Sequence, residues 1–328
     1  MVFLDLQELF KQEGENTVLY PLHFTMQEGE RVAIAGETGS GKSTLLKLIA
    51  GLLQPTGGNV YFEGMRVLGP DEQLLPGHPK IAYLSQHYEL RNNYKVHELL
   101  SMTNQLDYRS AQQIFEVCRI AHLMMRRSDE LSGGEKQRIA LAKQLTSYPK
   151  LLLLDEPFSN LDRVHKALIR SVIEDISDKL KVTCVLVSHD ATDLLSWADR
   201  ILIMQDGQLV QQGAPRQLYH HPVNEYVAAL MGEYNLINTK THEVFVQMLG
   251  EGVRGKRALI RPEQLAISVS KPSNPHWVEG VVQKVMFFGA YYAIEVLVDG
   301  FTLKVNTPTF LFNPGDIVFV FVASNSTA

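Results

Sequence analysis

The chain has 328 residues, a length that favours two domains at roughly 150 residues each. Its composition, 45% hydrophobic and 20% charged with a mean hydropathy of -0.06, is that of a soluble globular protein and excludes collagenous and disordered chains. The formal charge of -5 excludes a global positive field that would attract nucleic acid or anionic lipid. No run approaches about 18 consecutive apolar residues and residues 1–10 lack an apolar leader, so we expect neither a membrane span nor export. Cys118 and Cys184 lie in apolar segments and predict buried thiols in a reducing, cytoplasmic compartment.

The first domain is predicted to have an α/β fold with a parallel sheet. Between Glu28 and Gly51 a short apolar run, a glycine-rich loop and apolar residues at helical spacing follow one another, which predicts strand, loop and helix. Further along, continuous apolar runs alternate with a helical pattern, as expected for parallel strands covered on both faces. The predicted strands are 31–35, 151–154 and 182–187, and the predicted helices are 44–49 and 168–180.

Two further regions differ from this pattern. Residues 92–145 show helical faces without a convincing strand and predict a helical insert in the first domain, which we place at 1–233. Beyond the first domain, strand-like runs dominate, and Asp299-Gly300 between two of these runs is a strong hairpin signal. Residues 234–328 are therefore predicted to form a small, mostly antiparallel β domain of OB-like barrel type.

Residues 36–43 match the P-loop pattern GxxxxGK[ST] between a predicted strand and a predicted helix, which indicates a P-loop NTPase with a RecA-like sheet. Glycines let backbone N–H groups close around phosphate oxygens, and the helix N-terminus adds partial positive charge. Lys42 is expected to reach the β and γ phosphates, and the Ser43 hydroxyl to bind Mg²⁺. A glycine loop that only joins strand to helix is the alternative, disfavoured by Lys and Ser at the required positions. The predicted nucleotide-binding residues here are Gly36, Glu37, Thr38, Gly39, Ser40, Gly41, Lys42, Ser43 and Thr44.

Two carboxylates, Asp155 and Glu156, directly follow the predicted strand at 151–154. At the carboxyl end of a strand, Asp155 can hold Mg²⁺ through its water shell, and Glu156 can polarise a water for attack on the γ phosphate. Paired acids after a strand are by themselves more often the start of a solvated loop. Following a P-loop in an α/β domain, the catalytic interpretation is favoured.

Residues 131–137 read Leu-Ser-Gly-Gly-Glu-Lys-Gln and precede a helical run. Alone, such a segment is a loop with Ser132 as the helix N-cap. Together with the P-loop and the Asp-Glu pair, it resembles the signature of the ATPase subunits of ATP-binding cassette (ABC) transporters. The resemblance implies a homodimer with two shared ATP sites, in which the signature faces the γ phosphate bound by the other subunit. The signature residues are Ser132, Gly133, Gly134 and Glu135.

Other positions of this family also have counterparts. Gln86 matches the glutamine that approaches Mg²⁺ and links the nucleotide to the helical insert, so the resemblance implies a metal set of Ser43, Gln86 and Asp155. Residues 159–162 resemble the D-loop, which crosses the dimer interface. His189 resembles the switch histidine that contacts the γ phosphate and holds the catalytic water with Glu156. A lone histidine after a strand is usually structural, so His189 is singled out by its position only.

The aromatic residue that stacks on adenine in this family has no clear counterpart. A gapless placement puts Glu13 at that position. Phe10 and Tyr20 lie nearby, although either can simply be a core residue. We take Phe10 as the candidate for the adenine contact.

The C-terminal β domain resembles the OB-like TOBE domain of importer ATPases. The resemblance rests on Ile260-Arg261-Pro262-Glu263, on residues 280–282 and on the hairpin at 288–298. OB-type barrels also bind oligonucleotides, but this one lacks a basic and aromatic stripe. The aromatic residues between 287 and 292 are expected to be core residues.

The sequence therefore predicts an ATPase that uses ATP and Mg²⁺ to drive solute import through a separate transmembrane permease. Its expected partners are a second ATPase subunit, the permease subunits and a solute-binding protein acting on the permease, and no nucleic acid. Its expected location is cytoplasmic, peripheral to the inner membrane. A non-transport ABC ATPase of translation or DNA repair is the alternative, although such proteins usually carry two cassettes or a long coiled coil. A P-loop kinase or GTPase would leave residues 131–137 unexplained. The sequence does not identify the solute.

Overall fold

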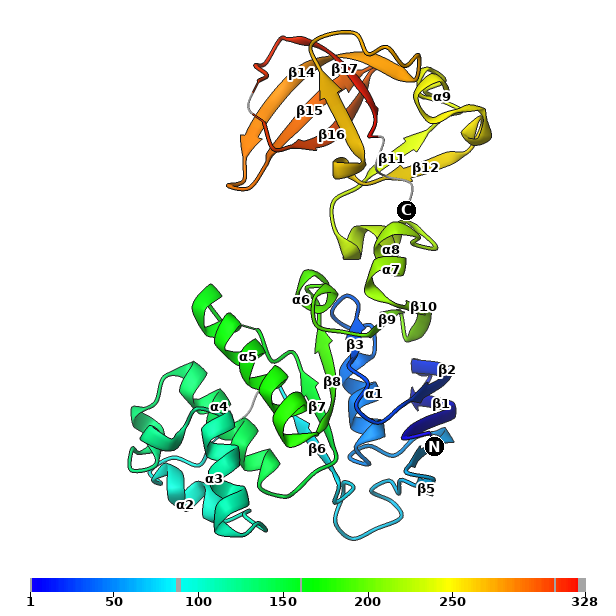
Figure 1. Cartoon of the computed structure of the whole chain (residues 1–328). Coiled ribbons are helices and arrows are strands. Elements are labelled where there is room, and N and C mark those ends of the chain that lie inside the picture. Colours follow the sequence, from blue (N-terminus) through cyan, green and yellow to red (C-terminus); the bar gives the residue numbers. More distant parts are fainter. Residues whose placement is uncertain (1, 87–89, 160, 310, 324–328) are drawn as a thin grey trace. The chain divides into compact units, whose positions relative to one another are not determined.

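The computed structural model describes residues 2–86, 90–159, 161–309 and 311–323 (Figure 1). Its contacts divide the chain into two compact units, residues 1–218 and 219–328. This division falls earlier than the boundary that the sequence predicted between 233 and 234. Helix α8 (Glu225–Met231) therefore belongs to the second unit, while the division falls within helix α7 (Pro215–His220).

The buried side chain of Arg261 explains why α8 belongs with the β domain. Arg261 is 1% exposed, and its guanidinium donates to several backbone carbonyls. It also lies 4.1 Å from the centroid of the Tyr219 ring. Burial lowers the pKa of Arg261, but guanidinium stays charged in proteins. The accepting carbonyls are those of Tyr219, Ala228, Gly232 and Glu233.

A six-stranded, mostly parallel sheet forms the centre of the first unit, as predicted. In sheet order its strands are β10 (Gln208–Gly213), β9 (Arg200–Gln205), β3 (Val32–Ala35), β8 (Thr183–Ser188), β7 (Leu151–Asp155) and β6 (Ile81–Leu84). All neighbours are parallel except β10, which pairs antiparallel with β9. Every residue of β7 and β8 is buried, which explains their continuous apolar runs. The carboxyl ends of these strands lie at one edge, where ligands bind in open α/β sheets.

A second, antiparallel sheet in the first unit was not anticipated from the sequence. Its order is β2 (Asn16–Met26), β1 (Leu4–Glu13), β4 (Gly57–Phe62) and β5 (Met65–Arg66). The buried side chains of this sheet share one hydrophobic core with helix α1 (Lys42–Ile49) and with the central sheet. The long strands β1 and β2 contain several register shifts, which hide the regular alternation that would have revealed them.

Residues 92–145 form the predicted helical insert. It contains α2 (Val96–Ser101), α3 (Tyr108–Val117), two 3-10 turns (Ala121–Leu123 and Ser128–Glu130) and α4 (Gly133–Leu145). Asp107 caps α3, because its Oδ1 accepts from the backbone N–H groups of Arg109 and Ser110 at 2.9 and 3.0 Å. After β7, the long helix α5 (Arg163–Leu180) returns the chain to β8, which is followed by the short helix α6 (Thr192–Leu195).

The second unit is mostly antiparallel β structure, as predicted. Its five-stranded sheet has the order β13 (Leu265–Ser268), β17 (Ile317–Val322), β14 (Trp277–Phe287), β15 (Tyr292–Val298) and β16 (Phe301–Thr307). Asp299 and Gly300 join β15 to β16 with φ angles of 49° and 77°, as a tight primed hairpin turn requires. The remaining elements are β11 (Asn235–Asn238), α9 (Val244–Leu249), β12 (Arg257–Ile260) and 3-10 turns at Glu251–Val253 and Pro262–Gln264.

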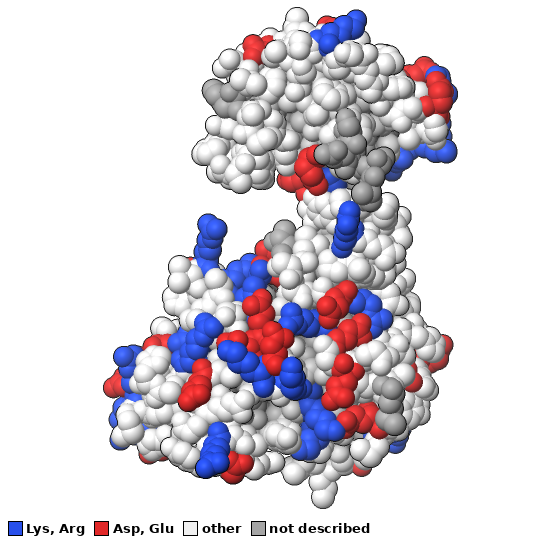
Figure 2. All heavy atoms as spheres, viewed as in Figure 1, with Lys and Arg blue, Asp and Glu red and all other residues white. Residues whose placement is uncertain are grey.

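Charge is distributed differently over the two units. On the face shown in Figure 2, basic and acidic side chains are mixed over the first unit, while most of the visible second unit is uncharged. Both cysteines are buried, as expected, and burial raises the pKa of each thiol to about 12. Among the described residues, none of the helices combines the length and apolar character needed to cross a membrane.

Candidate functional site

The glycine-rich loop between β3 and α1 has the backbone that a phosphate cradle needs. Gly36, Gly39 and Gly41 have φ angles of 155°, 87° and 94°, which side-chain-bearing residues rarely adopt. A Cβ on Gly36 would lie only 2.2 Å from the carbonyl oxygen of Met204, so no other residue fits there. Gly41 is the N-cap of α1 and brings no side chain to its first turn. The first-turn N–H groups of α1 are thus available to an anion.

Lys42 folds back over this loop. Its Nζ donates to the carbonyls of Gly36 and Glu37 at 2.8 and 2.6 Å and to Ser40 Oγ at 3.3 Å, and the residue is 5% exposed. Burial lowers the pKa of Lys42, whereas the carboxylates of Glu156, Asp155 and Glu37 favour its charged form. Asp155, the last residue of β7, and Glu156, which follows it, therefore act electrostatically on this ammonium. The neighbouring residues Thr38, Gly39 and Ser43 are exposed to solvent.

Asp155, at the carboxyl end of β7, carries a buried oxygen without a partner. Its Oδ2 accepts from the hydroxyl of Tyr83 at 2.8 Å. Its Oδ1 is buried and, within the described part of the chain, has no hydrogen-bond donor. A buried carboxylate oxygen without a donor is costly unless a cation neutralises it. Asp155 thus has the property expected of a metal ligand.

Tyr83 was missed by the sequence analysis. It lies on β6 opposite Leu153 of β7, which directs its hydroxyl to Asp155. Burial and the nearby carboxylate raise the pKa of Tyr83 above its usual value, so it is a neutral donor at physiological pH. Its signal in the sequence is a polar hydroxyl within an otherwise apolar strand, three residues before Gln86.

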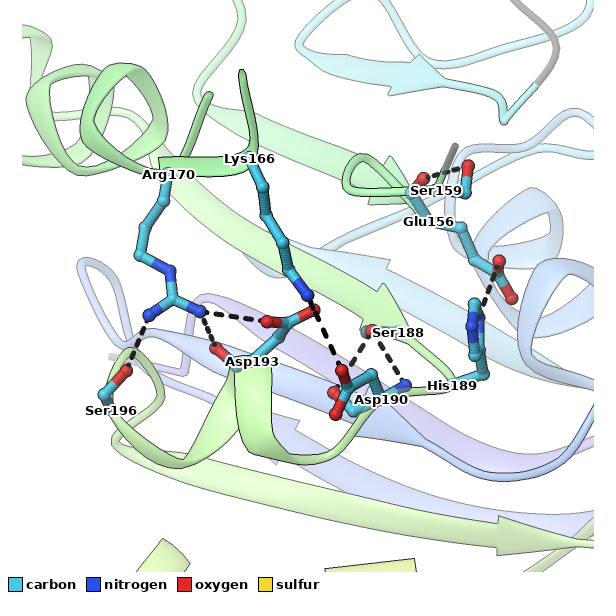
Figure 3. A network of polar contacts seen from close by, with 9 residues as sticks. All are labelled: Glu156, Ser159, Lys166, Arg170, Ser188, His189, Asp190, Asp193 and Ser196. Carbon is cyan, nitrogen blue, oxygen red and sulfur yellow. Dashed lines mark hydrogen bonds and ion pairs between the residues drawn. The ribbon is translucent and has the colours of Figure 1, made fainter. Parts of the chain in front are cut away.

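Glu156 and His189 meet at the ends of the adjacent strands β7 and β8 (Figure 3). Glu156 has a φ of 49°, a left-handed conformation that is uncommon for a residue with a side chain, and its N–H donates to the carbonyl of Val187 at 3.1 Å. Its carboxylate Oε2 lies 3.0 Å from His189 Nδ1. The Glu156 side chain is 15% exposed and that of His189 is 57% exposed. Strained backbone of this kind is typical of functional sites.

A pocket of about 240 Å³ adjoins this pair. It brings Gln86, Glu156 and His189 together, three residues that were singled out from distant parts of the sequence. Ser159 also lines it, and its hydroxyl donates to the carbonyl of Glu156 at 2.9 Å. The remaining lining residues are Phe158, Lys166, Ser188, Asp190 and Asp193.

The signature forms a capped helix start, as the N-cap interpretation of Ser132 predicted. Ser132 N–H donates to Glu135 Oε2 at 2.8 Å, and Glu135 N–H donates to Ser132 Oγ at 3.3 Å, which is a capping box. These hydrogen bonds are the main reason that the pKa of Glu135 is lowered. Ser132 and Gly133 are exposed, while Gly134 is buried against the ring of His165. None of residues 132–135 lines the pocket that contains Glu156 and His189.

The segment that resembles the D-loop lies between Glu156 and α5. Asp162 caps α5 by accepting from the N–H groups of Val164 and His165, both at 2.9 Å. Asn160, the second residue of this segment, lies outside the described residues. The segment thus starts beside the pocket and ends at the first turn of α5.

Phe10, the candidate adenine contact, lies on β1 opposite Gly57 of β4. Its ring occupies the space beside Gly57, where a Cβ would come within 2.2 Å of it. The P-loop residue Gly41 instead approaches Val18, whose carbonyl oxygen lies 3.0 Å from the position of a Cβ on Gly41. Val18, on β2, therefore lies beside the phosphate cradle, whereas the ring of Phe10 lies beside Gly57 of β4.

Comparison with known proteins supplies two family matches. The family described as "ABC transporter" matches residues 19–159, and the family described as "TOBE domain" matches residues 258–327. These ranges include the P-loop, Gln86, the signature and Glu156 in the first unit, and most of the β strands in the second. His189 lies outside both ranges.

Individual relatives match over most of their length. A glucose import ATP-binding protein of Saccharolobus solfataricus is 32% identical, with 90% of this chain and 88% of that protein covered. An Fe(3+) ions import ATP-binding protein of Pseudomonas fluorescens is 34% identical, with the same coverage of 90% and 88%. Among solved structures, the dimeric post-hydrolysis ATP-binding cassette MJ0796, bound to ADP and Pi, has a TM-score of 0.56 and 26% identity. That match covers 65% of this chain and 99% of the solved one.

Proposed function

The chain belongs to the ABC transporter family as an ATP-binding subunit whose ATPase activity drives solute import, and we propose how its residues divide this work. The relatives are import subunits, which does not support a role in translation or DNA repair. The observation that carries the proposal is the contact between Glu156 and His189, beside a pocket that also contains Gln86. In this proposal Glu156 is the general base, His189 is the polar partner of that base, and Gln86 is the group able to sense the nucleotide.

ATP binds with its phosphates in the loop from Gly36 to Ser43. In the structure Lys42 donates to carbonyls of this loop, and these bonds are exchanged for phosphate oxygens when the nucleotide enters. The backbone amides of the exposed residues Thr38 and Gly39, together with Thr44 at the first turn of α1, complete the cradle. The adenine base lies toward β1 and β2, where Val18 approaches the loop and Phe10 remains a candidate for stacking.

The residues present also fit a Mg²⁺ ion bound with the nucleotide. The fit rests on the buried Oδ1 of Asp155, which no described donor satisfies, and on the exposed hydroxyl of Ser43. Such oxygen atoms are the ligands that Mg²⁺ prefers, and Gln86 supplies a further one. Among the described residues no cluster of three or more His, Cys, Asp or Glu could hold a metal alone, which suits an ion held mainly by phosphates. When bound, the ion neutralises charge on the β and γ phosphates.

Glu156 acts as the general base for the water that attacks the γ phosphate. Its carboxylate is mostly buried and points to His189, which holds it in position and reaches the γ phosphate from its exposed side. Because β7 and β8 are adjacent parallel strands, the two side chains project from the same edge of the sheet. This arrangement places the base before the nucleotide arrives.

Each ATP is shared between two copies of the chain. The signature residues 132–135 do not line the pocket with Glu156, yet Ser132 and Gly133 are exposed at the start of a 13-residue helix. A helix N-terminus of this kind favours an anion such as a terminal phosphate. The D-loop segment 159–162 lies at the same interface, and the TOBE domain adds contacts away from the nucleotides.

The partners follow from the import function. Transmembrane permease subunits dock where Gln86 meets the helical insert, a solute-binding protein delivers solute to the permease, and the ATPase lies on the cytoplasmic face of the inner membrane. The relatives are named for solutes as different as glucose and Fe(3+) at similar identity. The solute is therefore a property of the permease and the solute-binding protein.

The test is ATP hydrolysis by Glu156→Gln, which keeps the shape of the side chain but removes the base. Turnover is expected to fall on the order of 10²-fold, while ATP affinity stays close to that of the parent. Glu174→Gln, on α5, is the matched control. A Glu156→Gln rate within about twofold of the parent would exclude Glu156 as the base.

A further inference from the structure

Two cations on α5 meet a buried carboxylate on α6, next to the proposed catalytic pair (Figure 3). Lys166 Nζ lies 2.6 Å from Asp193 Oδ2, and an Arg170 terminal nitrogen lies 3.1 Å from Asp193 Oδ1. The Asp193 side chain is only 7% exposed. We call Lys166, Arg170 and Asp193 the α5–α6 ion cluster. Lys166 and Arg170 are four residues apart and therefore lie on one face of the helix.

The α5–α6 ion cluster holds the segment that follows His189. Arg170 also donates to the backbone carbonyl of Asp193 at 3.1 Å and to Ser196 Oγ at 3.0 Å. Lys166 also lies 3.5 Å from the carboxylate of Asp190, the residue directly after His189. These contacts hold the segment on the carboxyl-terminal side of His189 against α5.

The same helix contacts the segment that follows Glu156. The Arg170 guanidinium lies 5.8 Å from the centroid of the Phe158 ring, two residues after Glu156. Lys166 lines the pocket together with Glu156 and His189. One face of α5 therefore contacts both segments that carry the proposed catalytic residues.

The His189 segment needs such an anchor. The His189 side chain is 57% exposed, so packing alone does little to fix its ring. Helix α6 has only four residues and cannot be stable without tertiary contacts. Ala191, Leu194 and Trp197 pack this segment against the fold, and the buried Asp193 carboxylate, paired with two cations, adds a polar fixed point next to the exposed His189. Replacing one partner of such a buried group leaves the others uncompensated.

We propose that Asp193 is a positioning residue for ATP hydrolysis, which with Lys166 and Arg170 holds His189 within hydrogen-bonding distance of Glu156. This inference rests on the roles proposed above for His189 and Glu156. Asp193 contacts neither nucleotide nor water in this scheme, and acts only through the His189 segment. A displacement of a catalytic group by about 1 Å can cost a large factor in rate.

The test begins with Asp193→Asn in the full chain. The expected result is a fall in kcat of about 10-fold to 100-fold with the KM for ATP within about twofold of the parent. Asp193→Glu keeps the charge and should recover part of the rate. Asp175→Asn is the matched control, because Asp175 is also ion-paired on α5 but contacts Lys179 and Arg119 instead of the pocket. A parental kcat for Asp193→Asn would overturn the proposal.

A double-mutant cycle separates positioning from a general effect on the fold. If Asp193 acts through His189, Asp193→Asn should slow a His189→Ala chain by less than about twofold. Equal fold-losses in the two backgrounds would overturn the positioning role. Lys166→Gln, which leaves Asp193 paired with Arg170, should show the same dependence on His189 with less effect on the thermal midpoint. A parental rate for His189→Ala would instead overturn the role proposed for His189 itself.

Discussion

Lys42 in the first unit and Arg261 in the second are both buried cations, 5% and 1% exposed, that donate to backbone carbonyls. The carbonyls that accept from Lys42 belong to its own loop, five and six residues earlier. Those that accept from Arg261 lie 28 to 42 residues earlier, in α7, α8 and the segment after α8. A cation bonded within one loop can exchange its partners for a ligand, whereas one that joins distant segments stabilises the fold.

The largest expected effect is that of Lys42→Ala on activity. Loss of this donor should lower ATP hydrolysis on the order of 10²-fold to 10³-fold, because the β and γ phosphates lose their charged partner. The free energy of unfolding should change by less than about 1 kcal/mol, since the freed carbonyls can be hydrated at the loop. Lys47→Ala, on the exposed side of the same helix, is the control. A large loss of stability would show that Lys42 serves the fold as Arg261 does.

Arg261→Ala should have the opposite profile. The substitution leaves four carbonyls, one buried and three partly buried, without their donor and is expected to destabilise the second unit by about 3 kcal/mol or more. Arg261→Lys keeps the charge but loses the planar fork, so it should recover only part of this loss. Urea unfolding followed by the fluorescence of Trp277 reports on the second unit in a Trp197→Phe background. Parental unfolding of Arg261→Ala would contradict the comparison.

A smaller effect is expected at Tyr83, which holds Asp155. Tyr83→Phe removes the hydroxyl that donates to Oδ2, so Asp155 should be less well oriented toward the proposed Mg²⁺ ion. The Mg²⁺ concentration for half-maximal ATPase activity should rise about tenfold. Tyr61→Phe, on β4 of the other sheet, is the matched control. An unchanged Mg²⁺ dependence would show that Tyr83 does not support the proposed Mg²⁺ site.

The sequence predicted those features whose physical cause is local. The P-loop, the two acids at the carboxyl end of β7 and the Ser132 cap each depend on a few consecutive residues, and the apolar runs of β7 and β8 follow from burial on both faces. The hairpin at Asp299-Gly300 is likewise encoded by two residues.

Features that depend on distant pairing could not be predicted. The antiparallel sheet of β1, β2, β4 and β5 is interrupted by register shifts, and only its three-dimensional partners show it to be a sheet. Tyr83 reaches Asp155 through the pairing of β6 with β7. Lys166 and Arg170 have an ordinary helical spacing, and their role becomes visible only when Asp193 lies opposite them.

The most direct test of the central claim, that each ATP is hydrolysed between the P-loop of one copy and the signature of another, is the activity of a mixed dimer. Lys42→Ala and Ser132→Arg should each inactivate the homodimer, because each change damages both sites. A heterodimer that pairs the two variants places both changes in one site and leaves the other intact, so we expect activity to return to a large fraction of the parental rate per intact site. Heterodimers purified through two affinity tags make this measurement direct. If they are no more active than either homodimer, the shared site is wrong.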